Sequence, residues 1–215
     1  MRKFFEHTKQ AILITFTMFL LCGFIYPLAV TALAQGVFPY KANGSLIEVD
    51  GQARGSELIG QAFLKPTYFW GRVSSVNYNV YTKMDTIPDE NGQLNYSGVS
   101  SGSFNYAPTN PELKTRIEAD IEKFLLANPA VERQDIPADL MTASGSGLDP
   151  HISVKAAEIQ IQRIVQASGL SEQEIRNILD TYTETRALGI FGENRVNVLM
   201  ANLAIMKKIE ERKGE

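Results

Sequence analysis

The feature that most constrains this chain is an apolar segment near its N-terminus. Between Lys9 and Lys41 the sequence has no charged residue, and residues 11–34 are apolar apart from three threonines and one tyrosine. As a helix this stretch would extend about 36 Å, which is enough to cross a hydrocarbon core of roughly 30 Å with some tilt. We therefore expect a single transmembrane helix over residues 11–34.

The residues before this segment predict its orientation. The flank, residues 1–10, has three basic residues against one carboxylate, and a positive flank tends to stay in the cytoplasm. Residues 1–10 are therefore predicted to be cytoplasmic, and residues 41–215 to form one globular domain outside. Pro27 predicts a kink beside a packed partner helix, because a neighbouring helix can satisfy the backbone groups that a proline leaves free.

A cleavable signal peptide is the alternative interpretation of the same segment. Ala32-Leu33-Ala34 before Gln35 matches the small-residue pattern of a cleavage site, which would release a secreted binding protein or hydrolase after Ala34. However, the apolar run is longer than the roughly 7–15 residues usual for a signal peptide. Bulky apolar residues also continue up to the cleavage point. We expect the segment to be retained.

Composition narrows the classes of function. The chain has 21 basic and 24 acidic residues, and three of the basic ones lie in the flank, so the domain is mildly acidic. This argues against nucleic-acid binding, which needs a basic face. Cys22 is the only cysteine, and His151 is the only histidine of the domain. An internal disulfide is therefore excluded, and catalytic triads and His-rich or thiolate metal sites are not expected.

Local signals predict an α/β (α+β) domain that is helix-rich in its C-terminal half. Residues 45–49 are predicted to form a strand that ends at the turn Asp50-Gly51, and residues 77–111 a long loop with one hairpin at Asn91-Gly92. Helices are expected after this loop. Their predicted positions are 110–128 with Asn110 as cap, 153–169, from the capping box that opens at Ser171, and from Asn194 or Val196 to the C-terminal cations.

Residues 142–153 are the most site-like stretch. Its glycines and polar residues include Gly145, Ser146, Gly147, Asp149 and His151. The G-x-S-x-G spacing of a nucleophile elbow is absent, and Asp149 with His151 supplies too few ligands for a metal. We therefore favour, over a catalytic site, a glycine-dependent turn in which Asp149 and Ser153 cap a helix and His151 hydrogen-bonds locally.

Two other groups of residues attract attention. The aromatic triplet Tyr68-Phe69-Trp70 is interpreted as an anchor in the core or a partner, in preference to a ligand platform. The charged residues around Glu184, Arg186 and Arg195 are interpreted as structural salt bridges, with a charged partner surface as the alternative. No phosphate-binding loop and no Asp-Lys-Thr-Gly phosphorylation sequence is present, so an autonomous ATPase is not expected.

Several distinctive sequence motifs occur in order along the chain. They are Tyr26 to Thr31, residues 42–47, Tyr68 to Arg72, Ala107 to Pro111, residues 137–153 and residues 192–202. Together they resemble the C subunit of the bacterial Kdp potassium-transporting ATPase. The family-motif residues and candidate interface are Tyr26, Pro27, Tyr68, Phe69, Trp70, Gly71, Arg72, Pro108, Asn110, Gly145, Ser146, Gly147, Asp149, His151, Glu184, Arg186, Arg195 and Asn197.

This resemblance implies a non-catalytic accessory subunit of an ATP-driven P-type pump for high-affinity potassium uptake in the bacterial cell membrane. The implied partners are a channel-like potassium-binding subunit and a P-type ATPase subunit, whose assembly this chain would stabilise. The family is described as raising the ATP affinity of the catalytic subunit. ATP and potassium are thus expected at the level of the complex, and neither is assigned a residue here, since ATP is cytoplasmic and the domain is predicted outside.

The chain also departs from the family pattern. Phe104, within Ser101 to Asn105, stands where the family usually has a glycine, which makes a phosphate-cradling loop less plausible there. The stretch Val80 to Val99 is longer than usual, which predicts a surface elaboration. Val73 stands where a proline is common. None of these departures touches the apolar segment.

Overall fold

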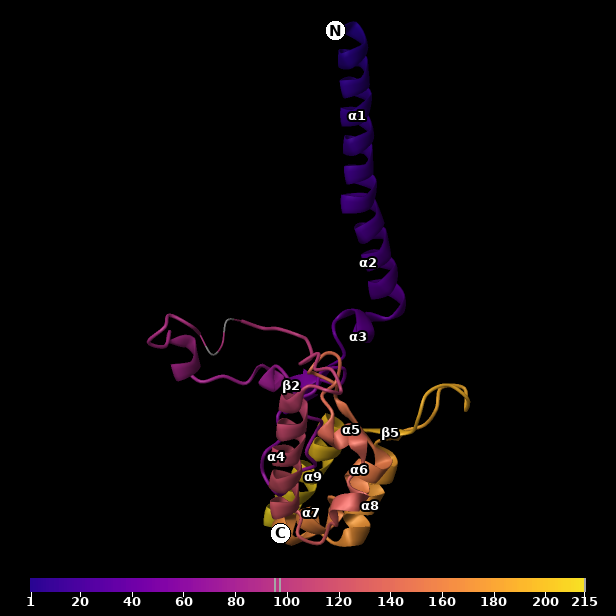
Figure 1. Ribbon diagram of the computed structural model, residues 1–215. Helices are drawn as coiled ribbons and strands as arrows, with labels where there is room; N and C mark the ends of the chain where they lie inside the picture. Colours follow the sequence, from indigo (N-terminus) through magenta and orange to yellow (C-terminus); the bar gives the residue numbers. More distant parts are fainter. Residues whose placement is uncertain (95, 97, 215) are drawn as a thin grey trace. The chain divides into compact units, whose positions relative to one another are not determined.

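The computed structural model describes residues 1–94, 96 and 98–214, which form two compact units, Met1–Ser56 and Glu57–Glu215. The first unit is mainly one long helix that is continuous through three segments (Figure 1). These are α1 (Arg2–Leu20), a π-helical turn (Leu21–Ile25) and α2 (Tyr26–Val37). A short helix α3 (Pro39–Ala42) and a hairpin of β1 (Leu46–Val49) and β2 (Gln52–Ser56) complete the unit.

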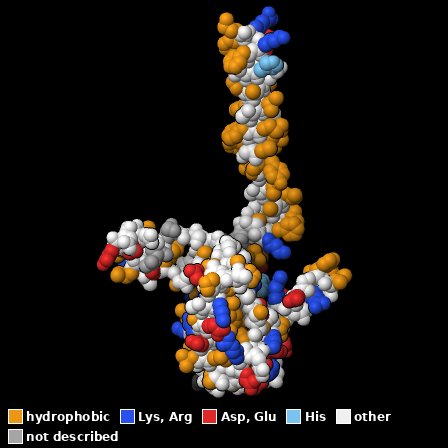
Figure 2. All heavy atoms as spheres, viewed as in Figure 1, with side chains coloured by type: hydrophobic (Ala, Val, Ile, Leu, Met, Phe, Trp, Pro, Cys, Tyr) orange, Lys and Arg blue, Asp and Glu red, His pale blue; other side chains and the backbone are white. Residues whose placement is uncertain are grey.

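The long helix is apolar and uncovered. Arg2–Val37 is, within the described part of the chain, the one helix long and apolar enough to cross a membrane, and none of its residues is buried. It begins nine residues earlier than the predicted span of 11–34, because the flank also continues the helix. Hydrophobic side chains cover much of its visible surface (Figure 2).

The predicted kink at Pro27 takes the form of the π-helical turn. Pro27 has no N–H, and its ring would collide with the carbonyl of Gly23 in regular α geometry. The helix widens just before the proline, where the Tyr26 N–H donates to the carbonyl oxygen of Leu21, five residues earlier. A π-bulge next to a proline is a common cause of a bend in a long helix.

The predicted strand and turn at the start of the domain are confirmed. β1 pairs antiparallel with β2, and the connecting residues Asp50 and Gly51 have φ angles of 53° and 71°. Two consecutive positive φ angles are the requirement of a type I′ hairpin turn, which Asp-Gly meets readily. Both strands belong to the unit Met1–Ser56.

The long loop predicted over residues 77–111 is confirmed in its described part, which holds only two short 3₁₀ turns, Asn77–Asn79 and Met84–Thr86. Of the hairpin predicted at Asn91-Gly92, the turn is present. The Gly92 N–H donates to the Asp89 carbonyl, and the Asp89 N–H donates to the Gln93 carbonyl at 2.8 Å, but strands do not flank the turn in the described residues. The Asp89 carboxylate instead binds nearby backbone N–H groups, which favours a turn over a ladder.

The elaboration Val80 to Val99 is closed at its base by one side chain. The Asn79 amide donates to the Ser100 carbonyl and accepts from the Ser100 N–H, at 3.0 Å in both cases. Tyr81 and Tyr96 stack within the loop with ring centroids 3.9 Å apart. Residues 95 and 97, which belong to this stretch, lie outside the described part of the chain.

The C-terminal half holds most of the secondary structure of the second unit. Its helices are α4 (Pro111–Ala127), a 3₁₀ turn (Arg133–Asp135), α5 (Ala138–Met141), α6 (Val154–Glu158), α7 (Ile161–Ser168), α8 (Glu172–Thr181) and α9 (Val198–Gly214). Its strands are β3 (His151–Ser153), β4 (Thr183–Glu184) and β5 (Arg195–Asn197), which form an antiparallel sheet in the order β3-β5-β4. The predicted α+β character and helix-rich C-terminal half are confirmed.

Two of the predicted helices have different bounds. The helix expected over 153–169 is split into α6 and α7, because Gln160 turns inward between them and is fully buried. The last helix begins at Val198, after the predicted start at Asn194 or Val196, because residues 195–197 are paired in the sheet as β5. By contrast, α4 begins at Pro111 with the Asn110 cap, and α8 has the predicted Ser171–Glu174 capping box.

The core lies among α4, α6 to α9 and the sheet. Its fully buried apolar side chains include Phe69, Ile164, Ile175, Val196 and Ile205. Phe69 belongs to a long irregular segment, and its side chain packs in the core together with those of the helices. That segment leads directly to the candidate site.

Candidate functional site

The segment 66–72 carries the aromatic triplet and is held by side chains where a strand would be held by a neighbouring strand. Asn202 of α9 accepts the Phe69 N–H at 2.8 Å and donates to the Phe69 carbonyl at 2.9 Å. Gln160 makes the equivalent pair with Trp70, at 2.8 and 3.2 Å. Buried backbone polar groups need such partners, so two amide side chains replace a sheet ladder here.

Arg163 of α7 also binds the segment 66–72. Its guanidinium donates to the carbonyls of Pro66 (2.6 Å) and Tyr68 (2.9 Å), and lies 4.5 Å from the centre of the Trp70 ring. Its Nε donates to the Asn128 amide oxygen at 2.9 Å. Burial lowers the pKa of Arg163 to about 10, which still leaves it charged at neutral pH. The predicted anchoring of the triplet in the core is confirmed, with Phe69 buried and its two neighbours half-buried.

Arg72, at the end of this segment, begins a chain of ion pairs. Its Nη1 lies 2.9 Å from Asp149 Oδ2. The other carboxylate oxygen of Asp149 accepts the His151 N–H at 3.0 Å and lies 3.5 Å from His151 Nδ1. Burial acts to raise the pKa of Asp149, but the hydrogen bonds from His151 and Arg72 outweigh it and hold the pKa at about 2. Asp149 is therefore ionised throughout the physiological range.

The same chain continues into the sheet. His151 Nε2 lies 3.2 Å from Glu184 Oε1, and Glu184 Oε2 accepts from Arg195 Nε at 2.9 Å. Burial raises the pKa of Glu184, but the hydrogen bonds from Arg195 and His151 lower it overall. The sheet creates this arrangement, because Glu184 of β4 stands opposite Arg195 of β5, which also pairs with β3. The structure thus connects Arg72, Asp149, His151, Glu184 and Arg195, a group we call the ion-pair chain.

The predicted roles of Asp149 and His151 need correction. Asp149 does not cap the helix, because its carboxylate is engaged by the His151 N–H and by Arg72. Ser153 does cap it, as predicted, and accepts the Ala156 N–H at 3.1 Å. Asp139 holds Ser153 in turn, through the Ser153 N–H at 2.8 Å. The ring of His151 bonds to Glu184, which is remote in the sequence, so its contact is not only local.

The glycine-dependent turn predicted within residues 142–153 is confirmed for one glycine, Gly147. Gly147 has a φ of +68°, and a Cβ there would lie 2.8 Å from the Gly102 carbonyl oxygen. Ser74 Oγ donates to the Gly147 carbonyl at 2.6 Å, and the Gly102 N–H donates to the Ser146 carbonyl at 2.8 Å. Gly145 has no such constraint. The loop is therefore hydrogen-bonded to two segments that precede α4, one at Ser74 and one at Gly102.

Tyr78 holds the backbone of Arg72 through a hydrogen bond. Its hydroxyl donates to the Arg72 carbonyl at 2.7 Å, and a Cβ on Gly71 would lie 2.8 Å from that hydroxyl oxygen. Burial and the charge of Asp149 raise the pKa of Tyr78 to about 12, so the phenol remains a donor. The close approach explains why a glycine precedes Arg72. Tyr78 was not among the predicted site residues.

Within the described part of the chain, the remaining predicted residues make no ion pair with this group, although Asn197 stands opposite His151 in the sheet. Pro108 is exposed in a turn, and Asn110 caps α4. Asn197 accepts the Met200 N–H at the start of α9 and donates to the Glu57 carbonyl at 2.8 Å. Arg186 is exposed in the arm that connects β4 and β5. Tyr26 and Pro27 are exposed on α2, in the other unit.

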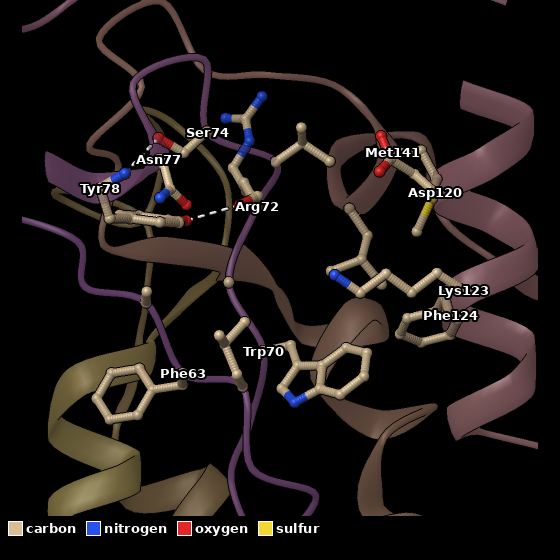
Figure 3. Close-up of a pocket in the computed structure, with 15 residues that line it drawn as sticks. Phe63, Trp70, Arg72, Ser74, Asn77, Tyr78, Asp120, Lys123, Phe124 and Met141 are labelled. Carbon is tan, nitrogen blue, oxygen red and sulfur yellow. Dashed lines mark hydrogen bonds between the residues drawn. The ribbon is translucent and has the colours of Figure 1, made fainter. Parts of the chain in front are cut away.

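A pocket of about 310 Å³ opens beside the triplet. Figure 3 shows Phe63, Trp70 and Phe124 on its apolar side, with Arg72 above them and Lys123 reaching in from α4. The departure Phe104 does not line it, but lies under Arg116, whose guanidinium is 5.3 Å from the Phe104 ring centre. Residues 1–94, 96 and 98–214 contain no cluster of three or more His, Cys, Asp or Glu side chains suited to a metal.

The arm between β4 and β5 carries an apolar tip that sequence patterns did not indicate. Leu188, Ile190 and Phe191 expose 88%, 72% and 65% of their surface. Hydrophobic side chains gather at the end of this arm in Figure 2. Residues 187–191 are four apolar residues and one glycine, which are too few to show a helical or strand periodicity. The one signal in the sequence was that this short apolar run stands between charged residues.

Other important residues were also missed. Gln160, Arg163 and Asn202 are polar residues among apolar neighbours that are buried, which was the signal that each has a buried partner. Gly60 was missed as well, although a Cβ there would lie 2.6 Å from the Asp149 carbonyl oxygen. Nothing local in its sequence distinguishes this glycine.

Known proteins similar to this chain share most of its length. The family model KdpC, described as the c chain of the K+-transporting ATPase, matches residues 8–207. A potassium-transporting ATPase KdpC subunit from Clostridioides difficile is 55% identical over 199 residues, which cover 93% of this chain and 96% of the relative. Relatives of the same name from Clostridium kluyveri and Caldanaerobacter subterraneus are 50% and 44% identical, each covering 97% of this chain and 97% and 98% of the relative.

Proposed function

This chain belongs to the KdpC family and is an accessory subunit of a potassium pump, and from that premise we propose that helix Arg2–Val37 anchors it in the bacterial cell membrane. The observation that carries the proposal is the uncovered apolar surface of this helix. It is about 54 Å long, and its central residues 11–34 bear no charge. A water-exposed monomer rarely leaves so much contiguous apolar surface unburied.

The proposed orientation rests on the charges at the two ends. The basic flank, residues 1–10, is proposed to face the cytoplasm, and residues 41–215 to lie outside the cell. The polar hairpin of β1 and β2 then follows the span on the outer side. This topology also places the ion-pair chain, from Arg72 to Arg195, outside the membrane.

We propose two partner subunits, a channel-like potassium-binding subunit and a P-type ATPase subunit, with the helix packed beside their spans. In the outer domain, the apolar tip Leu188–Phe191 is a candidate contact, because large apolar side chains at the end of an arm gain stability when a partner covers them. The ion-pair chain supports such a contact, since Glu184 and Arg195 fix the strands from which the arm projects.

The proposed role is assembly without an independent reaction. The side chains of the ion-pair chain are engaged with one another, which suits a rigid brace better than a catalytic group that must change protonation. ATP and potassium are handled at the level of the complex. An effect of this subunit on the ATP affinity of the catalytic subunit would then be indirect, through the packing of the spans.

The alternative of a secreted protein released after Ala34 gains no support. The family match begins at residue 8 and therefore includes the apolar segment. The relatives also cover 93–97% of this chain. Intact mass of the purified protein would expose any cleavage.

Cysteine labelling tests the proposed topology. In a Cys22→Ala background, Lys3→Cys and Glu90→Cys each provide one thiol, on the flank and on the exposed loop. We expect a membrane-impermeant maleimide to label Glu90→Cys in intact spheroplasts, and Lys3→Cys only after lysis. The reverse pattern would contradict the orientation. Labelling of both sites in spheroplasts, with the protein absent from the membrane pellet, would contradict the anchor itself.

A further inference from the structure

The carbonyl of Cys22 lacks the donors that a helix normally provides. A helical carbonyl accepts from the N–H four residues later in α geometry, or five residues later in π geometry. For Cys22 these positions are Tyr26 and Pro27. The Tyr26 N–H donates to the Leu21 carbonyl, and Pro27 has no N–H. The Cys22 carbonyl oxygen is therefore left with a free lone pair by the backbone of its own helix.

The position of this carbonyl makes the missing donor costly. Cys22 lies near the middle of the uncharged stretch 11–34, about 17 Å from either end, which is the centre of a bilayer of roughly 30 Å. Water is absent at that depth, and lipid tails offer no donor. The nearby Thr17 hydroxyl is already committed, at 2.8 Å, to the Leu13 carbonyl. A donor must come from another polypeptide.

We propose that the Cys22 carbonyl is the docking point for a hydrogen-bond-donating side chain on a neighbouring membrane helix of the pump. This inference rests on the proposed anchor, because only a membrane makes the free carbonyl expensive. The donor is a hydroxyl, a carboxamide or an imidazole N–H, the groups that form hydrogen bonds between helices within bilayers. It belongs to a partner subunit, since this chain is an accessory subunit of a larger pump.

The helix surface near this carbonyl permits a close approach. Gly23 follows Cys22 and has no side chain, and a Cβ placed there would meet only the Phe19 ring, at 3.7 Å. Small residues at such points allow the backbones of membrane helices to come close. The π-helical turn, Leu21–Ile25, includes both Cys22 and Gly23, so the free carbonyl and the small residue lie in the same turn. Geometry and chemistry thus favour the same contact.

The single cysteine allows this carbonyl to be observed directly. Feeding [1-13C]cysteine places the label at one carbonyl of this subunit, because Cys22 is its only cysteine. The labelled full chain is measured by solid-state NMR in lipid bilayers, alone and after reconstitution with unlabelled partner subunits. We expect the 13C resonance to move downfield, toward a hydrogen-bonded carbonyl, in the complex only.

Three other outcomes would overturn the inference in different ways. An unchanged resonance in a correctly assembled complex would show that no donor binds there, while leaving the proposed function intact. A downfield resonance for the chain alone, lost on dilution with lipid, would assign the donor to a second copy. Failure of the labelled wild-type chain to join the complex would instead contradict the proposed function.

A proline variant provides a second, independent test. Pro27→Ala restores an N–H, so the labelled carbonyl should show the downfield position even in the isolated chain. Its affinity for the partner subunits should fall roughly threefold to twentyfold, the range expected for one interhelical hydrogen bond. Pro39→Ala, at the first position of α3 and outside residues 11–34, is the matched control and should change neither reading. Equal partner affinities of the two variants would contradict the docking role.

Discussion

The Asn202→Ala substitution tests how the aromatic segment is held in the core. Asn202 is 1% exposed and Phe69 is fully buried. The two hydrogen bonds between the Asn202 amide and the Phe69 backbone, at 2.8 and 2.9 Å, satisfy both the N–H and the carbonyl of Phe69. Removing the amide leaves a buried N–H and a buried carbonyl without partners, since alanine reaches neither.

The size of the effect follows from these two groups. Each unsatisfied buried group costs about 1–3 kcal/mol, so we expect the free energy of unfolding to fall by about 2–5 kcal/mol, allowing for some water entry. For a domain of this size each kcal/mol corresponds to about 2–4 °C in Tm. The expected loss is therefore on the order of 5–15 °C. Arg72, three residues after Phe69, should lose its position in the same variant.

Trp70 is the reporter for this measurement. It is the only tryptophan, it adjoins Phe69, and it lies over Arg163, so its fluorescence follows unfolding of the domain and not of the membrane helix. Thermal unfolding of the full chain is recorded in mild detergent. Asn177→Ala, at an exposed position of α8, is the matched control and should shift the Tm by less than about 2 °C. An Asn202→Ala protein as stable as this control would refute the reasoning.

Three further predictions concern the ion-pair chain and its supports. Gly147→Ala should lower the Tm by several degrees, because alanine there would have a positive φ and a Cβ 2.8 Å from a carbonyl oxygen. Gly145→Ala is the control and should leave the Tm unchanged. Equal Tm values for the two variants would contradict the steric constraint at Gly147. The pKa of Asp149 is lowered to about 2, so the stability it contributes is present above about pH 4 and is lost as the pH falls toward 2. Asp149→Asn should therefore flatten the dependence of Tm on pH between about 4 and 2, and a curve as steep as that of wild type would argue against the ion pair. The pKa of Tyr78 is raised to about 12, so Tyr78→Phe should remove one phenol from the late part of an absorbance titration. A late part unchanged by this substitution would contradict the raised pKa of Tyr78.

The sequence predicted best the elements that local chemistry determines. Asn110 with Pro111, and the capping box of Ser171 and Glu174, mark helix starts within their own residues, so α4 and α8 begin where expected. Asp50-Gly51 likewise determines its turn through two positive φ angles. None of these features needs a distant partner, which is why one sequence was enough.

Elements that depend on distant contacts were missed or misplaced. The break between α6 and α7 depends on Gln160, whose side chain binds Trp70, ninety positions away. α9 begins later than predicted because residues 195–197 pair with β3 and β4. The periodicity of apolar residues along the sequence does not reveal such pairing.

The candidate site shows the same division. The glycine-dependent turn at Gly147 was predictable from composition, and Arg72, Asp149, His151, Glu184 and Arg195 were each identified singly from motifs. Their connection was not predictable, because His151 and Glu184 meet only through the sheet. Asp149 was assigned a capping role for the same reason, since its true partner Arg72 lies 77 residues away.

Native mass spectrometry of the tagged protein, extracted from membranes in mild detergent, tests the central claim most directly. One spectrum reports both the mass of this chain and the subunits bound to it. The account predicts a chain that retains residues 11–34, released from a complex with two larger partner subunits. A lone chain that begins at Gln35 would contradict both the anchor and the assembly.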